Sequence, residues 1–132
     1  MDREKLLELY KKYNLEKNDV YKHQHYIIIT RQGIEKIAAL ENIQINYEVV
    51  KCEPNFAVIK AYANIASKPD IKIETFGSAL KGANYKDGNC NSWYVAEMAE
   101  KRALSRSVLK LTGFYELGVF GEDESDDFKK SK

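Results

Sequence analysis

The chain has 132 residues, of which 44% are hydrophobic, and its net charge at pH 7 is +1. This length suits one domain with tails, and the hydrophobic content can fill its core. The near-neutral charge excludes a polycation, so any affinity for a polyanion would come from a local cluster of basic side chains. No apolar run approaches the roughly 18 residues of a membrane span, and the charged start MDREKLLELYKKY has no apolar signal-peptide region.

The first third of the sequence predicts two helices with a short strand between them. Asp2 is placed to cap a helix that runs to about Tyr13, where apolar residues recur at helical spacing. A polar connector over 14–22 leads to the β-branched run HYIIIT, which predicts a strand ending at Thr30. Because Thr30 is also a good N-cap, we expect a second helix over about 31–42.

The middle third predicts three strands joined by short turns. In IQINYEVVK, over 43–51, apolar and polar residues alternate, which is typical of a strand with one solvated face. After the turns at EPN and SKPD, strands are expected over 56–66 and 71–77. Turns this short predict an antiparallel meander.

The last third predicts a loop, the longest helix and a tail. Residues 78–91 form the loop, and Asn91 or Ser92 is placed to cap a helix that ends at Gly113, a residue type common just beyond a helix C-terminus. The end of the chain, 116–132, is acidic and then basic, so we expect a flexible tail.

The order of these elements predicts an α+β fold, in which one domain over 1–115 combines an antiparallel β-meander with a long helix packed on one face. Small residues form a strip on that helix, which would let it lie close to the sheet: Ala96, Ala99, Ala103 and Ser107. Larger apolar residues share the neighbouring face: Trp93, Leu104, Val108 and Leu111.

A row of basic residues runs along the same helix. Arg102, Arg106 and Lys110 are spaced four residues apart, so they share one line beside the small strip. Apolar residues flank the row on its other side and suggest a surface for self-association: Val95, Met98 and Leu109. Two explanations stay open, because the row could be an ordinary solvated face or a phosphate track in a partly buried groove.

Three segments, in order, carry a resemblance to a known family. The strand and helix at 26–40 contain GIEKIA, the meander ends in FGSA at 76–79, and the long helix contains AEKRAL at 99–104. Over about 20–113 the chain thereby resembles the single-strand annealing proteins of phages (the Sak and Erf class), whose core the eukaryotic recombination annealase Rad-fifty-two shares. The resemblance implies an annealase-like core and a homo-oligomeric ring or filament that holds single-stranded DNA in a basic groove for recombination and repair.

The resemblance also implies which residues bind DNA. Lys101 and Arg102 match the basic pair of the family's KRAL motif and would contact the DNA backbone, so Arg102→Ala should impair binding and leave the fold intact. Ser105 separates this motif from Arg106, which departs from the family pattern. The basic row adds Arg106 and Lys110 as DNA-binding candidates, and position alone adds Lys81, Lys86 and Arg31.

Other chemistry has little support in the sequence. His23 and His25 lack a third metal ligand, and no catalytic motif occurs, so we expect no metal, no cofactor and no enzyme activity. Cys52 and Cys90 form no CxxC pair, which favours free thiols in a reducing compartment. Together with this, the resemblance implies a cytoplasmic location in a bacterial or phage-infected cell. The acidic EDESDDF resembles the tip with which single-strand-binding proteins recruit partners, so a host single-strand-binding protein is a candidate partner.

Two functions stay open at this point. The first is a single-stranded DNA-binding and annealing protein that acts as a homo-oligomer and does not involve a membrane. The second is a small α+β interaction module, such as a phage inhibitor or adaptor, that binds no nucleic acid. Salt-dependent binding to single-stranded DNA would separate them, because contacts with phosphates release counterions.

Overall fold

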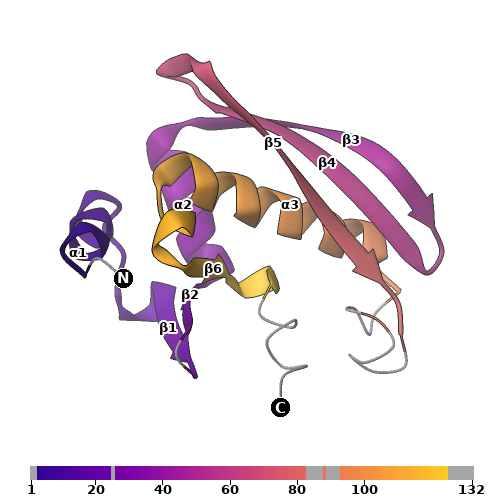
Figure 1. The fold of residues 1–132 in the computed structure, drawn as a ribbon, viewed down its shortest axis with the longest axis horizontal. Coiled ribbons are helices and arrows are strands. Elements are labelled where there is room, and N and C mark those ends of the chain that lie inside the picture. The colour runs from indigo at the N-terminus through magenta and orange to yellow at the C-terminus, as the bar shows by residue number, and fades with distance from the viewer. Residues whose placement is uncertain (1–2, 25, 83–87, 89–92, 125–132) are drawn as a thin grey trace.

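The computed structural model describes residues 3–24, 26–82, 88 and 93–124. These residues form an α+β fold with three α-helices and two three-stranded sheets. The longest helix contacts both sheets and runs beneath the larger one in Figure 1. The predicted capping residues Asp2, Asn91 and Ser92 lie outside the described residues, as does the candidate Lys86.

The N-terminal part holds a β-hairpin between two helices. Its elements are, in order, α1 (Arg3–Lys12), the 3-10 turn η1 (Lys17–Asp19), β1 (Val20–His23), β2 (Tyr26–Ile29) and α2 (Arg31–Glu41). The predicted strand and second helix are confirmed, and Thr30 caps α2 by accepting a hydrogen bond from the Gly33 N–H at 3.2 Å. The sequence predicts a connector where β1 lies, but VYKH becomes a strand because it pairs antiparallel with β2.

The larger sheet is the predicted meander. Its strands are β3 (Ile43–Glu53), β4 (Phe56–Ile65) and β5 (Lys68–Leu80), which pair antiparallel in the order β3-β4-β5. β5 extends beyond the predicted strand at both ends. At its start the turn contracts to Ala66 and Ser67, and Pro69 is tolerated because β5 is an edge strand.

The long helix α3 (Val95–Thr112) packs against β4 and β5 through its small residues, as predicted. Ala99 and Ala103 are fully buried. A Cβ at Gly77 of β5 would overlap the backbone of both residues, so only glycine permits this close approach. The helix ends at Gly113, which has a left-handed φ of 89° that suits glycine.

The end of the described chain folds back onto the smaller sheet. A short 3-10 turn, η2 (Tyr115–Leu117), leads to β6 (Val119–Gly121), which pairs parallel with β2, and then to η3 (Glu122–Glu124). Val119 is fully buried, and the Phe120 ring lies edge-on to Tyr26 with centroids 5.8 Å apart. With β6 the structured part of the chain extends past the predicted domain boundary at 115. The sequence does not indicate this strand, because three residues are too few to show strand periodicity.

Among the described residues, two hydrophobic clusters form much of the core, one on each side of α3. The first lies among the helices and the smaller sheet: Leu6, Tyr13, Ile29, Ile34, Ile37, Val108, Leu109, Phe114 and Val119. The second lies under the meander: Ala57, Ile59, Ala79, Val95 and Ala99. The predicted apolar flank for self-association is therefore wrong, because Val95 and Leu109 are core residues.

Candidate nucleic-acid interface

Two arginines of the basic row lie along the outer edge of β5, and we call this line the α3–β5 seam. The Arg102 guanidinium donates to the Ser78 carbonyl at 2.7 Å, and the Arg106 guanidinium donates to the Phe76 carbonyl at 2.9 Å. Four helical residues rise about 6 Å, and two strand residues rise about 7 Å. The spacing of the row thus matches the spacing of outward-facing carbonyls on an edge strand.

Arg102 is a buried anchor. Its side chain is only 3% exposed. Besides the bond to Ser78, its Nε–H donates to the Asp123 carbonyl at 3.0 Å, so the guanidinium connects β5 to η3. This burial leaves little guanidinium surface for a phosphate, which departs from the external DNA contact that the resemblance implies for this residue.

Asp123 joins η3 to two helices. One carboxylate oxygen pairs with the Arg31 guanidinium at 3.3 Å, and the other accepts a hydrogen bond from the Ser105 hydroxyl at 3.3 Å. The neighbouring Glu122 carboxylate accepts a bond from the Arg31 backbone N–H at 3.1 Å. Two acidic residues of the predicted tail therefore hold the candidate Arg31, although the sequence separates them by about 90 positions.

The remaining described candidates are more accessible. Lys110 continues the row one turn beyond Arg106, is exposed, and lies 5.3 Å from the Tyr115 ring centroid. Lys101 is half-buried and projects about 100° away from Arg102 around the helix. The structure therefore brings Arg102 and Arg106 together on the seam, with Lys110 in line, and does not place Lys101 in that row.

Lys81 lies at the other end of the seam, just after β5, and beside Trp93, whose surroundings differ from the prediction. Its ammonium nitrogen is 4.8 Å from the centroid of the Trp93 ring. Trp93 was expected on the buried face of the long helix, but α3 begins only at Val95 and Trp93 is 67% exposed. A late helix start is hard to predict here, because Tyr94 occupies the N-cap position without a side-chain capping bond.

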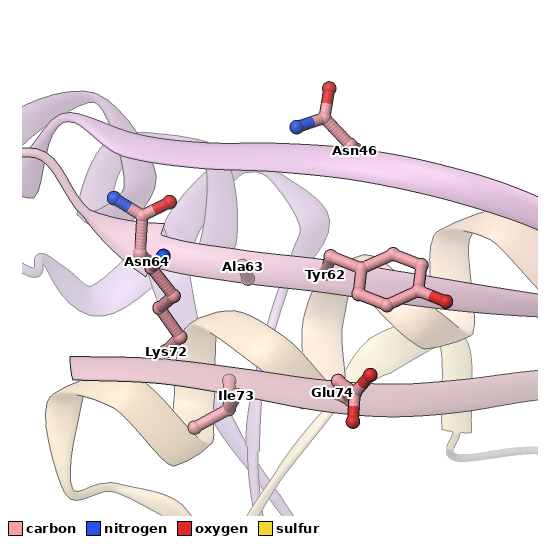
Figure 2. A pocket seen from close by; sticks show the side chains of 7 residues that line it. All are labelled: Asn46, Tyr62, Ala63, Asn64, Lys72, Ile73 and Glu74. Atoms are coloured by element: carbon pink, nitrogen blue, oxygen red, sulfur yellow. The ribbon is translucent and has the colours of Figure 1, made fainter. Parts of the chain in front are cut away.

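The open face of the meander carries a shallow pocket of about 430 Å³ (Figure 2). Its polar lining side chains stand up from all three strands: Asn46, Tyr62, Asn64, Lys72 and Glu74. Beside it Lys60 pairs with Glu74 at 3.2 Å, and the Tyr62 hydroxyl donates to Glu48 at 2.7 Å. Since lysine and glutamate charges offset one another on this face, it is a weaker candidate for a polyanion than the seam.

β3 is the other edge of the meander, and its apolar residues from Tyr47 onward are exposed, whereas Ile43 and Ile45 are half-buried. Tyr47, Val49 and Val50 are the main exposed ones, and Val49 is 60% exposed. Partial burial, together with the nearby Glu100 carboxylate, raises the pKa of Tyr47 to about 12, so this phenol stays neutral. Within the described residues no further strand pairs beyond β3.

Comparison with protein-family models, curated proteins and solved structures finds no match. The resemblance to annealing proteins therefore depends on the sequence segments alone, and the annealase-like core stays a prediction.

No group of three or more His, Cys, Asp and Glu residues in the described part of the chain could hold a metal ion. His23 is half-buried in β1, whereas His25 and Cys90 lie outside the described residues. Cys52 is an exposed free thiol. None of the described helices is both long and apolar enough to cross a membrane.

Proposed function

We propose that the protein binds single-stranded DNA along the α3–β5 seam and, as a homo-oligomer, promotes annealing of complementary strands in recombination and repair. The observation that supports this most is the line of cations along the seam, from Lys110 and Arg106 to Lys81 beside the exposed Trp93. A basic track with aromatic side chains is the combination that binds single strands without sequence preference.

The cations of the seam have different tasks in this proposal. Arg106 is half-buried and Lys110 exposed, so both can offer charge to a phosphate, and Lys81 does so at the far end. Arg102 instead holds β5 and η3 in place, because its guanidinium is buried against two backbone carbonyls. Its charge still adds to the local potential, since a buried charge is screened less than an exposed one.

Annealing by this protein would need no catalytic group. A strand has to be held extended with its bases accessible to a complement, and phosphate contacts along one line achieve this. We accordingly expect no enzyme activity, no metal and no cofactor.

Self-association is proposed through β3 rather than through the flank of α3. The β5 edge is covered in part by the two arginines, whereas β3 presents exposed Tyr47, Val49 and Val50 at the opposite edge. An uncovered edge strand is a template for pairing with another chain, so a second copy of the protein is the partner we propose for it.

A protein-interaction module without nucleic-acid binding is the second candidate. The burial of Arg102 favours it, because the central arginine of the row is then explained by the fold alone. The exposed β3 edge also favours it, since a peptide of another protein could add there as a strand.

Two measurements on the purified protein test the proposal. Fluorescence anisotropy of a labelled single-stranded oligonucleotide should show binding that weakens with salt and exceeds binding to the matching duplex. Mixing complementary labelled oligonucleotides with the protein should then speed their annealing. Absence of any salt-dependent binding at micromolar protein would contradict the proposal and leave the interaction module.

A further inference from the structure

Trp93 and Tyr94 stand out from the described surface. They precede α3 directly and are 67% and 68% exposed, the largest fractions of any large hydrophobic side chain that the structure describes. Tryptophan is highly buried on average, and Trp and Tyr are enriched in binding sites rather than on plain surface. Two such residues side by side, at the start of the longest helix, therefore point to a ligand.

The Lys81 ammonium beside Trp93 indicates that this ligand carries negative charge. The ammonium nitrogen lies 4.8 Å from the Trp93 ring centroid, within the distance of about 6 Å at which a cation and an aromatic ring attract each other. The backbone N–H of Lys81 donates to the Asn55 carbonyl at 2.7 Å, so the lysine is anchored to the β3–β4 turn. A positive charge is thereby held at the rim of an open aromatic surface.

The same end of the molecule continues the cation line of the seam. From Phe76, where Arg106 binds, to Lys81 there are five strand residues, or about 17 Å. A polyanion that follows the seam would reach Lys81 and then the two aromatic rings. Its flat apolar groups would have a stacking partner there, whereas an acidic peptide would supply charge without flat rings.

We propose that Trp93, with Tyr94 beside it, is a stacking platform for the bases of single-stranded nucleic acid, and that Lys81 binds the adjoining phosphate. The inference rests on the proposed function and adds the part of the ligand that the seam alone does not define. Stacking accepts every base because each has a π face, so the platform confers no sequence preference.

The sole tryptophan of the chain makes this testable at one position. Titration with an unlabelled oligothymidylate should change Trp93 emission and saturate at the same protein-to-strand ratio as anisotropy with the labelled strand. Trp93→Ala should weaken binding about 5- to 150-fold, the range for loss of one stacked base. Trp93→Phe keeps a flat ring and should stay within about threefold of the parent protein.

The salt dependence separates the platform from the phosphate contact. Trp93→Ala should leave the slope of log K against log salt unchanged, whereas Lys81→Ala should reduce it by about 0.7, the value for one contact with a single strand. Tyr21→Ala is the matched control, because Tyr21 is an exposed aromatic on β1 of the other sheet and its loss should change neither quantity. Circular dichroism should show the same fold for every variant.

Failure of the platform and failure of the proposed function give different results. If the strand binds by anisotropy but Trp93 emission and Trp93→Ala affinity do not change, the platform is wrong and the seam stands. If no strand binds, both are wrong. If Trp93→Ala lowers oligomer size and emission follows protein concentration, the rings contact a second copy, which overturns the platform.

Discussion

The two edges of the meander are treated in opposite ways. On β5 the outward carbonyls of Phe76 and Ser78 accept hydrogen bonds from Arg106 and Arg102, so part of this edge is satisfied within the chain. On β3 no further strand pairs among the described residues, and Val49 and Val50 are exposed. Two arginines of the basic row therefore complete the edge of β5, and only the accessible members of the row, Arg106 and Lys110, can also bind a ligand.

The largest loss of stability is expected at the buried arginine, Arg102. Arg102→Ala removes donors from two carbonyls and should lower the free energy of unfolding by about 2–6 kcal/mol, since each buried acceptor left without a donor costs about 1–3 kcal/mol. Arg106→Ala, one turn away and half-buried, should cost about 1 kcal/mol. Urea denaturation followed by circular dichroism measures both.

This order reverses the expectation from the family motif, in which Arg102 contacts DNA and is dispensable for the fold. If Arg102→Ala kept the stability of the parent protein and lost only DNA affinity, the edge-completing role would be wrong.

A second prediction concerns the distance between α3 and β5. Gly77→Ala places a Cβ against the backbone of Ala99 and Ala103, so the helix must shift and stability should fall by about 1–3 kcal/mol. The displaced arginines should then leave the β5 edge, and the variant should aggregate more readily than the parent protein. Ser78→Ala is the neighbouring control, because this side chain is exposed and its loss should stay within about 0.5 kcal/mol.

The open edge gives the third prediction. Val49→Lys puts a charge on β3 where Val49 is mostly exposed, so the subunit should fold normally but its self-association should weaken at least tenfold. Ile71→Lys introduces the same charge on β5, which the proposal does not use for assembly, and should leave the oligomer intact. Light scattering on both variants compares the edges directly, and equal loss of assembly from the two would refute a special role for β3.

Acid should affect the smaller sheet before the meander. Burial disfavours the charge on Asp19, but hydrogen bonds from the Lys36 ammonium and the Glu16 N–H outweigh it and lower the pKa of this carboxyl. The lowered pKa stabilises the fold above the unfolded-state pKa of about 3.9, and this stabilisation is lost as the pH falls through the lower native value.

Hydrogen exchange should therefore show β1, β2 and α2 losing protection below about pH 4 while β4 stays protected. Asp19→Asn should be less stable than the parent protein at neutral pH and should lose this part of the acid sensitivity. Uniform loss of protection in both sheets would contradict the assignment to Asp19.

Local patterns in the sequence predict the elements whose stability depends on near neighbours. The strand at β3, the Thr30 cap and the Gly113 stop are confirmed in the structure, but burial alternates along β3 only over its first four residues. β1 and β6 escape prediction because each is short and becomes a strand only by pairing with β2. No local signal in three or four residues can indicate a partner that lies far away in sequence.

The basic row was predicted as a group, but not the ranking within it. Helical spacing places Arg102, Arg106 and Lys110 on one line, and it treats them as equivalent. Their burial differs because the C-terminal η3 covers Arg102, and that contact depends on the fold of a segment predicted as a tail. A helical turn rises about as far as two strand residues, and Gly77 allows α3 to lie close to β5. Together these two features could have indicated that arginines one turn apart bind the edge of the strand.

If the accessible end of the seam is a phosphate track, removing one of its cations should change the salt dependence of single-strand binding. The slope of log K against log salt should fall by about 0.7 in Arg106→Ala relative to the parent protein. Lys60→Ala should leave the slope unchanged, because Lys60 lies on the open sheet face and pairs with Glu74. Identical slopes in the parent protein and Arg106→Ala, or an equal fall in Lys60→Ala, would contradict the account.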